Sequence, residues 1–151
     1  MCRFALCCVI LLTTHKVSAQ VKPVHFEHIS NLQAKEKRLV MVIVEADWCK
    51  YCHALKQHII RDKEISATLS KSFYVAFLNG EEKRDIVFAG RKFKAQPNGI
   101  HQLADQLGTI EGKVTYPSLC FLNDKNEIIY QYSGYLKPAS FLRLLTVLSK
   151  K

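Results

Sequence analysis

The chain has 151 residues, of which 48% are hydrophobic and 23% are charged. This length and composition are typical of one globular domain with a sizeable core, and they exclude a disordered or collagen-like chain. The formal net charge is +9, but Lys and Arg are scattered in twos and threes and form no long run. We therefore expect a solvated basic surface and no nucleic-acid partner.

The first nineteen residues differ in character from the rest of the chain. Arg3 precedes an apolar or small run over 4–14, and small residues follow at 17–19. This order is typical of a cleaved secretory signal, and the run is shorter than the roughly 20 apolar residues that span a bilayer. We expect 1–19 to be removed, so that the mature protein begins at Gln20 and is periplasmic or secreted. An uncleaved membrane anchor is the alternative.

Removal of 1–19 would leave three cysteines, Cys49, Cys52 and Cys120. A secreted domain held together by disulfides usually has more cysteines, in an even number. Two of these three form a Cys-x-x-Cys, which predicts a redox pair. Cys120 lies inside the apolar run 118–122, where we expect a free buried cysteine acting as a small hydrophobic residue.

Residues 20–151 are predicted to form a single domain of alternating helices and strands. Apolar residues three positions apart predict a surface helix over 25–37, and continuous apolar runs predict buried strands over 39–44 and 73–78. A helix is expected to follow Cys52. Its apolar side is predicted to hold Leu55, Ile59 and Ile60.

The segment 79–116 is long for a simple crossover, so it is predicted to be a surface insertion that shapes substrate binding. We expect a hairpin formed by 85–88 and 91–95, followed by a helix near 99–107. The remaining predicted elements are strands at 118–122 and 127–132 and a C-terminal helix that starts near Pro138.

The motif Ala-Asp-Trp-Cys-x-x-Cys at 46–52 directly follows the strand 39–44, and Tyr116-Pro117 opens the strand 118–122. This combination resembles the thioredoxin superfamily, in particular its exported bacterial thioredoxin-like (thiol:disulfide interchange) members. The resemblance extends from about Leu39 to the C-terminal helix and leaves 79–116 outside the common pattern. It implies an α/β thioredoxin fold, in which a central mixed sheet is flanked by helices.

The two cysteines of the motif are predicted to carry the chemistry. Cys49 would lie at a helix N-terminus, where free backbone N–H groups and the helix dipole favour a thiolate, the form that attacks disulfides. Cys52 lies three residues later, within bridging distance, and would resolve the mixed disulfide. The redox-active disulfide Cys49–Cys52 would do this work without a cofactor, and we expect neither a cofactor nor a metal ion.

Other residues of the motif are expected to contact the substrate or to tune the pair. Lys50 either stabilises the Cys49 thiolate by its charge or simply points to solvent. Trp48, Lys50, Tyr51, Tyr116 and Pro117 are predicted to bind the substrate, with Trp48, Tyr116 and Pro117 lining the groove. The resemblance implies a cis peptide bond before Pro117, with the backbone of Tyr116 pairing with an extended substrate segment.

One position departs from the family pattern. Many thioredoxins have a buried Asp below the cysteines, which serves as a proton relay for the resolving thiol, and Ile43 occupies the matching position here. Glu45 lies two residues further along and shares a strand face with Ile43. The departure puts fast thioredoxin-like reduction in doubt, although the exchange chemistry itself is not affected.

Two other functions fit parts of the sequence. Cys-x-x-Cys followed by His53 matches a c-type haem attachment motif, but both methionines, Met1 and Met41, lie upstream, where they do not suit a second axial ligand. A non-catalytic binding module that keeps only the fold is the second alternative. Four further histidines lack metal-ligand spacing and are expected to be surface or helix-packing residues; they are His25, His28, His58 and His101.

The sequence leaves the direction of exchange open, because a reductase, an oxidase and an isomerase share these residues. We favour a reductase that acts on the disulfides of exported proteins, by analogy with exported Trp-Cys-x-x-Cys proteins. Its expected partners are exported protein thiols or disulfides and possible electron donors in the membrane. The protein is expected to be a monomer.

Overall fold

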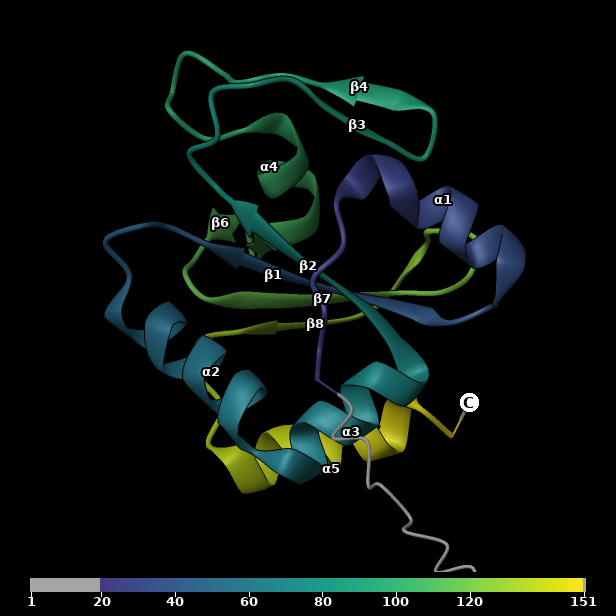
Figure 1. Ribbon diagram of the computed structural model, residues 1–151. Coiled ribbons are helices and arrows are strands. Elements are labelled where there is room, and N and C mark those ends of the chain that lie inside the picture. The colour runs from purple at the N-terminus through teal and green to yellow at the C-terminus, as the bar shows by residue number, and fades with distance from the viewer. Residues whose placement is uncertain (1–19, 151) are drawn as a thin grey trace, which may run out of the picture.

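The computed structural model describes residues 20–150 (Figure 1). The predicted signal segment 1–19 lies outside these residues. The helices are α1 Phe26–Lys35, α2 Lys50–Arg61, α3 Lys63–Ser72, α4 Gln102–Gly108 and α5 Pro138–Leu148. The strands are β1 Leu39–Glu45, β2 Phe73–Asn79, β3 Ile86–Phe88, β4 Arg91–Phe93, β5 Thr109–Ile110, β6 Lys113–Val114, β7 Ser118–Leu122 and β8 Ile128–Ser133.

The centre of the molecule is a four-stranded mixed sheet in the order β2-β1-β7-β8. Strands β1 and β2 are parallel, as expected for a crossover through helices, whereas β7 is antiparallel to both β1 and β8. Ile43 of β1 is opposite Phe77 on one side and Leu119 on the other. The predicted central mixed sheet is confirmed, and β1 is an interior strand.

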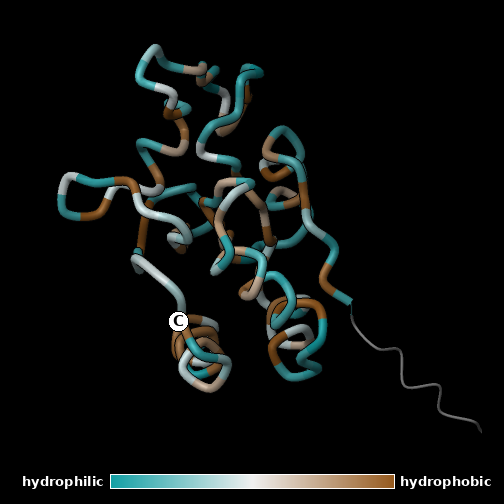
Figure 2. Tube along the Cα trace, turned by 90° about the vertical axis from the view of Figure 1, so that its left-hand side faces the viewer, coloured by the Kyte–Doolittle hydropathy of each residue, from teal (hydrophilic) through white to brown (hydrophobic). Residues whose placement is uncertain are grey.

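The two faces of the sheet carry separate cores, because successive side chains of a strand point to opposite faces. Val40, Val42 and Val44 face the layer that contains α1, α4 and the β3–β4 hairpin. Met41 and Ile43 face α2, α3 and α5. Figure 1 shows these two layers above and below the sheet. Figure 2 shows hydrophobic and hydrophilic residues alternating along the helices, as expected when one side of each helix is buried.

The region after the cysteines contains two helices instead of one. Helix α2 ends at Arg61, and the side chain of Asp62 accepts hydrogen bonds from the backbone N–H groups of Glu64 and Ile65 at the start of α3. The prediction that Ile60 lies on the apolar side is wrong, because its side chain is 56% exposed. Cys52, Leu55 and Ile59 already form the buried face of α2, and the next residue points about 100° away from it.

The insertion 79–116 contains the predicted β3–β4 hairpin and one further hairpin, β5–β6, which was not predicted. The turn of β5–β6 uses Glu111 and Gly112 at φ 52° and 77°. Helix α4 begins later than predicted because His101, which is fully buried, forms its N-cap: its Nδ1 accepts from the backbone N–H of Leu103 at 3.2 Å. No helix within residues 20–150 is long and apolar enough to cross a bilayer.

Candidate active site

Strand β1 leads directly into the candidate site. After Glu45 the chain turns, and the backbone N–H of Cys49 donates to the carbonyl oxygen of Ala46 at 3.0 Å. Helix α2 then begins at Lys50, with Cys49 as its N-cap residue. The strand is anchored on both sides in the sheet and its five central residues are buried, so the position of Cys49 is set by a rigid interior strand.

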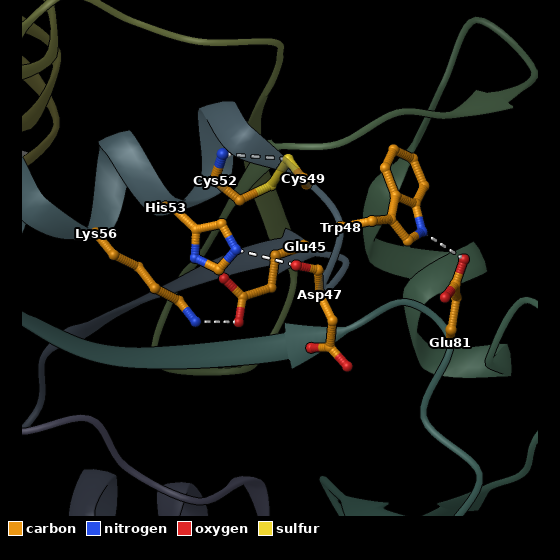
Figure 3. Close-up of a disulfide and its surroundings, with 8 residues drawn as sticks. All are labelled: Glu45, Asp47, Trp48, Cys49, Cys52, His53, Lys56 and Glu81. Atoms are coloured by element: carbon orange, nitrogen blue, oxygen red, sulfur yellow. Dashed lines mark hydrogen bonds and ion pairs between the residues drawn. A yellow bond between two sulfur atoms is a disulfide. The ribbon is translucent and has the colours of Figure 1, made fainter.

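Cys49 and Cys52 form a disulfide, with Cα atoms 5.3 Å apart (Figure 3). The Sγ atom of Cys49 also accepts a hydrogen bond from the backbone N–H of Cys52 at 3.1 Å. This is an N-cap interaction in which sulfur takes the place of the usual side-chain oxygen. Both cysteines are largely buried, at 4% and 1% exposure, so the resolving residue is only slightly more buried than its partner.

The electrostatics of this helix end favour negative charge on sulfur. The first turn of α2 contains no acidic side chain, so no carboxylate competes for the free N–H groups or neutralises the helix dipole. Lys50 is the first residue of α2 and is exposed, which places a cation beside Cys49 in sequence. Once the disulfide is reduced, this helix end would favour the thiolate form of Cys49.

The Tyr116–Pro117 peptide bond is cis, as the family resemblance implied. Tyr116 packs against the cluster formed by Ala46, Cys49 and Cys52. Its ring fills the space beside Gly80, where an added Cβ would lie 2.2 Å from the phenolic oxygen. Burial raises the pKa of Tyr116, and Glu81 raises it further, so the phenol stays neutral.

Trp48 is the most exposed large hydrophobic residue at the site, at 67%. Its indole N–H donates to a carboxylate oxygen of Glu81 at 3.1 Å (Figure 3). Its ring meets that of Tyr116 edge to face, with centroids 5.7 Å apart. One polar contact and one aromatic contact therefore fix the orientation of this exposed ring.

Below the cysteines, Ile43 occupies the position of the family's buried Asp, and an ion pair lies two residues further along the strand. Ile43 is fully buried in the core against α2, α3 and α5. Glu45 points to the same face and pairs with Lys56 of α2 (Figure 3). The ammonium group of Lys56 also lies over the ring of Phe77, 4.8 Å from its centroid. The side chain of Glu45 is only 12% exposed, so its carboxylate depends on this partner.

Tyr51, the residue just before Cys52, contacts a residue that sequence reasoning missed. Its ring centroid lies 5.9 Å from that of Tyr135, and the hydroxyl of Tyr135 lies 2.8 Å from Nε2 of His58. The backbone N–H of Gly134 donates to the carbonyl oxygen of Pro117 at 2.8 Å, which ties this loop to the cis-proline loop. The sequence indicates this contact only by placing an aromatic residue, Tyr135, directly after Gly134 at the end of β8.

His53, which completes the haem-attachment pattern, contacts the loop before the cysteines. Its Nε2 lies 3.0 Å from the carbonyl oxygen of Asp47 (Figure 3). A carbonyl only accepts, so Nε2 carries the proton in this bond. This bond links His53, in the first turn of α2, to the loop that precedes Cys49.

The third cysteine has a different environment. Cys120 is free and fully buried in the middle of β7, opposite Val42 of β1. Burial raises the pKa of its thiol to about 12. The prediction of a buried cysteine acting as a small hydrophobic residue is confirmed. Among residues 20–150, no group of three or more His, Cys, Asp and Glu side chains is arranged to hold a metal ion.

Comparison with known families shows that residues 26–148 match the model of the thioredoxin-like domain. The chain belongs to this family. A search of curated proteins found no match. Family membership and the Cys49–Cys52 disulfide together make the chain a thiol–disulfide oxidoreductase.

Solved structures share the fold at low sequence identity. A protein described as DsbH oxidoreductase is 14% identical, with a TM-score of 0.65 over 93% of this chain and 92% of that chain. A thioredoxin from Thermus thermophilus is 24% identical, with a TM-score of 0.58 over 87% of each chain. A thioredoxin-fold protein from Helicobacter pylori is 17% identical, with a TM-score of 0.59 over 75% of this chain and 70% of that chain. The thioredoxin fold predicted from the sequence is confirmed.

Proposed function

We propose that this chain is an exported thiol–disulfide reductase in which Cys49 attacks the disulfide of another exported protein and Cys52 resolves the intermediate. The observation that carries the proposal is the position of Cys49 as the N-cap of α2, with no acidic residue in the first turn. Export rests on the signal-like pattern of residues 1–19. The family's thiol chemistry gives the reaction class.

The proposed reaction starts from the dithiol form of the pair. The Cys49 thiolate attacks one sulfur of the substrate disulfide, a Cys49–substrate disulfide forms, and the released substrate sulfur takes up a proton. Cys52, as its thiolate, then attacks the Sγ of Cys49, which closes the Cys49–Cys52 disulfide and releases the second substrate thiol. The substrate gains the two electrons that the pair loses. A thiol reductant, which we propose to be a membrane partner, must then restore the dithiol.

The surroundings of the disulfide fit a protein substrate. Trp48 and Tyr116 form an oriented aromatic surface next to Cys49, and Pro117 lies just beyond Tyr116. We propose that these residues and Tyr51 contact an extended substrate segment, and that the backbone of Tyr116 pairs with it. Exposed aromatic rings of this kind supply contact area with little loss of side-chain freedom.

The attacking and resolving roles can be tested by trapping. The Cys52→Ser variant should accumulate a stable mixed disulfide between Cys49 and a substrate protein, and Cys49→Ser should accumulate none. Mass spectrometry of non-reduced samples measures both. Equal trapping by the two variants would contradict the assigned order, and trapping by neither would favour a non-catalytic binding module.

Export and the haem alternative have their own measurements. Expression of the full sequence should give a mature protein that starts at Gln20 in the periplasmic or secreted fraction, which N-terminal sequencing can establish. A protein that retains residues 1–19 in the membrane fraction would support the anchor alternative. Protein purified from cells able to attach c-type haem should show no Soret absorption band, and such a band would replace the reductase proposal.

A further inference from the structure

A pair of tyrosines next to the disulfide has a geometry that the proposed reaction does not require. Tyr51 lies between the two cysteines in sequence and is 66% exposed, yet its ring is held against Tyr135 at 5.9 Å and a 40° interplanar angle. Tyr135 is held in turn by His58, 77 residues away in the chain, through a 2.8 Å bond from its hydroxyl to Nε2. We call Tyr51, Tyr135 and His58 the tyrosine wall.

The wall is fixed relative to the reacting sulfur atoms by two connections. Tyr51 and His58 both belong to α2, whose N-cap is Cys49. Tyr135 follows Gly134, whose backbone N–H bonds to the carbonyl oxygen of Pro117. The wall therefore connects helix α2 with the loop that is bonded to Pro117, next to the residues that the proposed substrate segment would contact.

The chemistry of the wall identifies what it can bind. The hydroxyl of Tyr135 is already engaged by His58, so the ring surface that remains is apolar. Helix α2 carries no acidic residue that would attract a basic side chain to this place. Two neighbouring aromatic rings, one of them with its hydroxyl already bonded, favour contact with another large apolar or aromatic side chain.

We propose that the tyrosine wall is a specificity subsite that selects substrates with a large apolar residue close to the cysteine under attack. This inference rests on the proposed function, because it concerns the same disulfide-exchange site. Tyr51 and Tyr135 would contact the substrate side chain, whereas His58 is a positioning residue that acts through Tyr135.

The test compares two peptide disulfides that differ at a single residue beside the cysteine, leucine in one and serine in the other. Mature protein, reduced beforehand and freed of reductant, is mixed with each peptide, and the second-order rate constant of the single turnover is measured. We expect the wild type to react with the leucine peptide roughly three- to tenfold faster, the range that one aromatic contact supplies.

Variants of the three wall residues distinguish the tyrosines that would contact the substrate from His58, which would position Tyr135. Tyr135→Ala and Tyr51→Ala should bring the leucine-to-serine ratio close to one. Tyr135→Phe keeps the ring but loses the bond to His58, so the ratio should fall only in part. His58→Gln can still bond to the Tyr135 hydroxyl and should retain the preference, whereas His58→Leu should not. Ile60→Ala removes another exposed apolar side chain of the same helix and should leave the ratio unchanged.

The possible failures are distinguishable. If reduced wild-type protein reacts with neither peptide, the proposed reductase function is wrong. If it reacts with both at equal rates, or if Tyr51→Ala and Tyr135→Ala slow both peptides by the same factor, the specificity subsite is wrong and the function stands. Tyr51 is mostly exposed, so its replacement tests the inference even if a Tyr135 variant fails to fold.

Discussion

The N-terminus of α2 and the middle of β7 both hold cysteine sulfur, but the two regions give it opposite properties. Cys49 caps the N-terminus of α2, where the backbone N–H of Cys52 donates to its Sγ atom. Cys120 lies inside a strand that is buried along its whole length, and burial raises the pKa of its thiol to about 12. The availability of a reactive thiolate therefore depends on where the cysteine lies relative to backbone N–H donors and to solvent.

The largest effect expected from this comparison concerns activity. Cys49→Ser should lower the rate of disulfide exchange by at least about a thousandfold, because a serine hydroxyl is not deprotonated under conditions where a thiolate forms. Cys120→Ala should change the rate by less than about twofold, since Cys120 is buried away from the site. Reduction of a model protein disulfide at pH 7 measures both variants. Similar losses of rate in the two variants would contradict the assignment of Cys49 as the reactive cysteine.

Alkylation measures the same difference in the unmodified chain. In the reduced folded protein, Cys49 should react with iodoacetamide at least about a hundredfold faster than Cys120, because the Cys120 thiol has a raised pKa and no access to reagent. Mass spectrometry of timed samples gives the rate at each site. Unfolding in guanidinium chloride serves as the control, and should make Cys120 reactive. Fast modification of Cys120 in the folded state would show that β7 is more accessible than the structure indicates.

A stability effect of intermediate size is expected below the active site. Lys56→Met should lower the free energy of unfolding by about 1–3 kcal/mol, because it leaves the nearly buried carboxylate of Glu45 without its partner. Urea denaturation measures the change. The double variant Glu45→Gln/Lys56→Met removes the uncompensated charge and should recover part of the loss. A single variant as stable as the wild type would mean that solvent can replace Lys56.

The smallest effect lies in the insertion and depends on pH. The Arg84 side chain and backbone hydrogen-bond the carboxylate of Glu82 and lower its pKa to about 2. The ionised form therefore favours the folded state above the unfolded pKa of 4.5, and this contribution is lost as the pH falls toward 2. Glu82→Gln should lower Tm at pH 7 by less than about 4 °C. A difference that persists at pH 2 would contradict this origin.

The sheet and the cysteine site could be predicted from the sequence because their signals are local. The apolar run of β1 leads without a break into Trp48 and Cys49, and the N-cap position of Cys49 follows from that order. The boundary between α2 and α3 was also readable, since Asp62 is a favoured N-cap residue, yet it was interpreted as part of one helix. Ile60 is exposed because it lies five residues after Leu55, about 140° around the helix from it.

Contacts between distant parts of the chain could not be predicted in the same way. His58 and Tyr135 are 77 residues apart, and no spacing rule joins a helix to the loop after β8. The pairing of Glu45 with Lys56 likewise depends on how α2 packs across the sheet. The β5–β6 hairpin has two residues in each strand, too few for a periodic pattern, although Glu111-Gly112 is a turn signal.

The reduction potential of the Cys49–Cys52 pair tests the central claim most directly. It can be measured by equilibration with glutathione, or with a stronger dithiol buffer, in the Cys120→Ala background, so that only the pair titrates. A reductase predicts a two-electron transition near roughly −270 mV, the value typical of thioredoxin. A transition near roughly −120 mV, as in strong periplasmic oxidants, or no transition at all, would contradict the account.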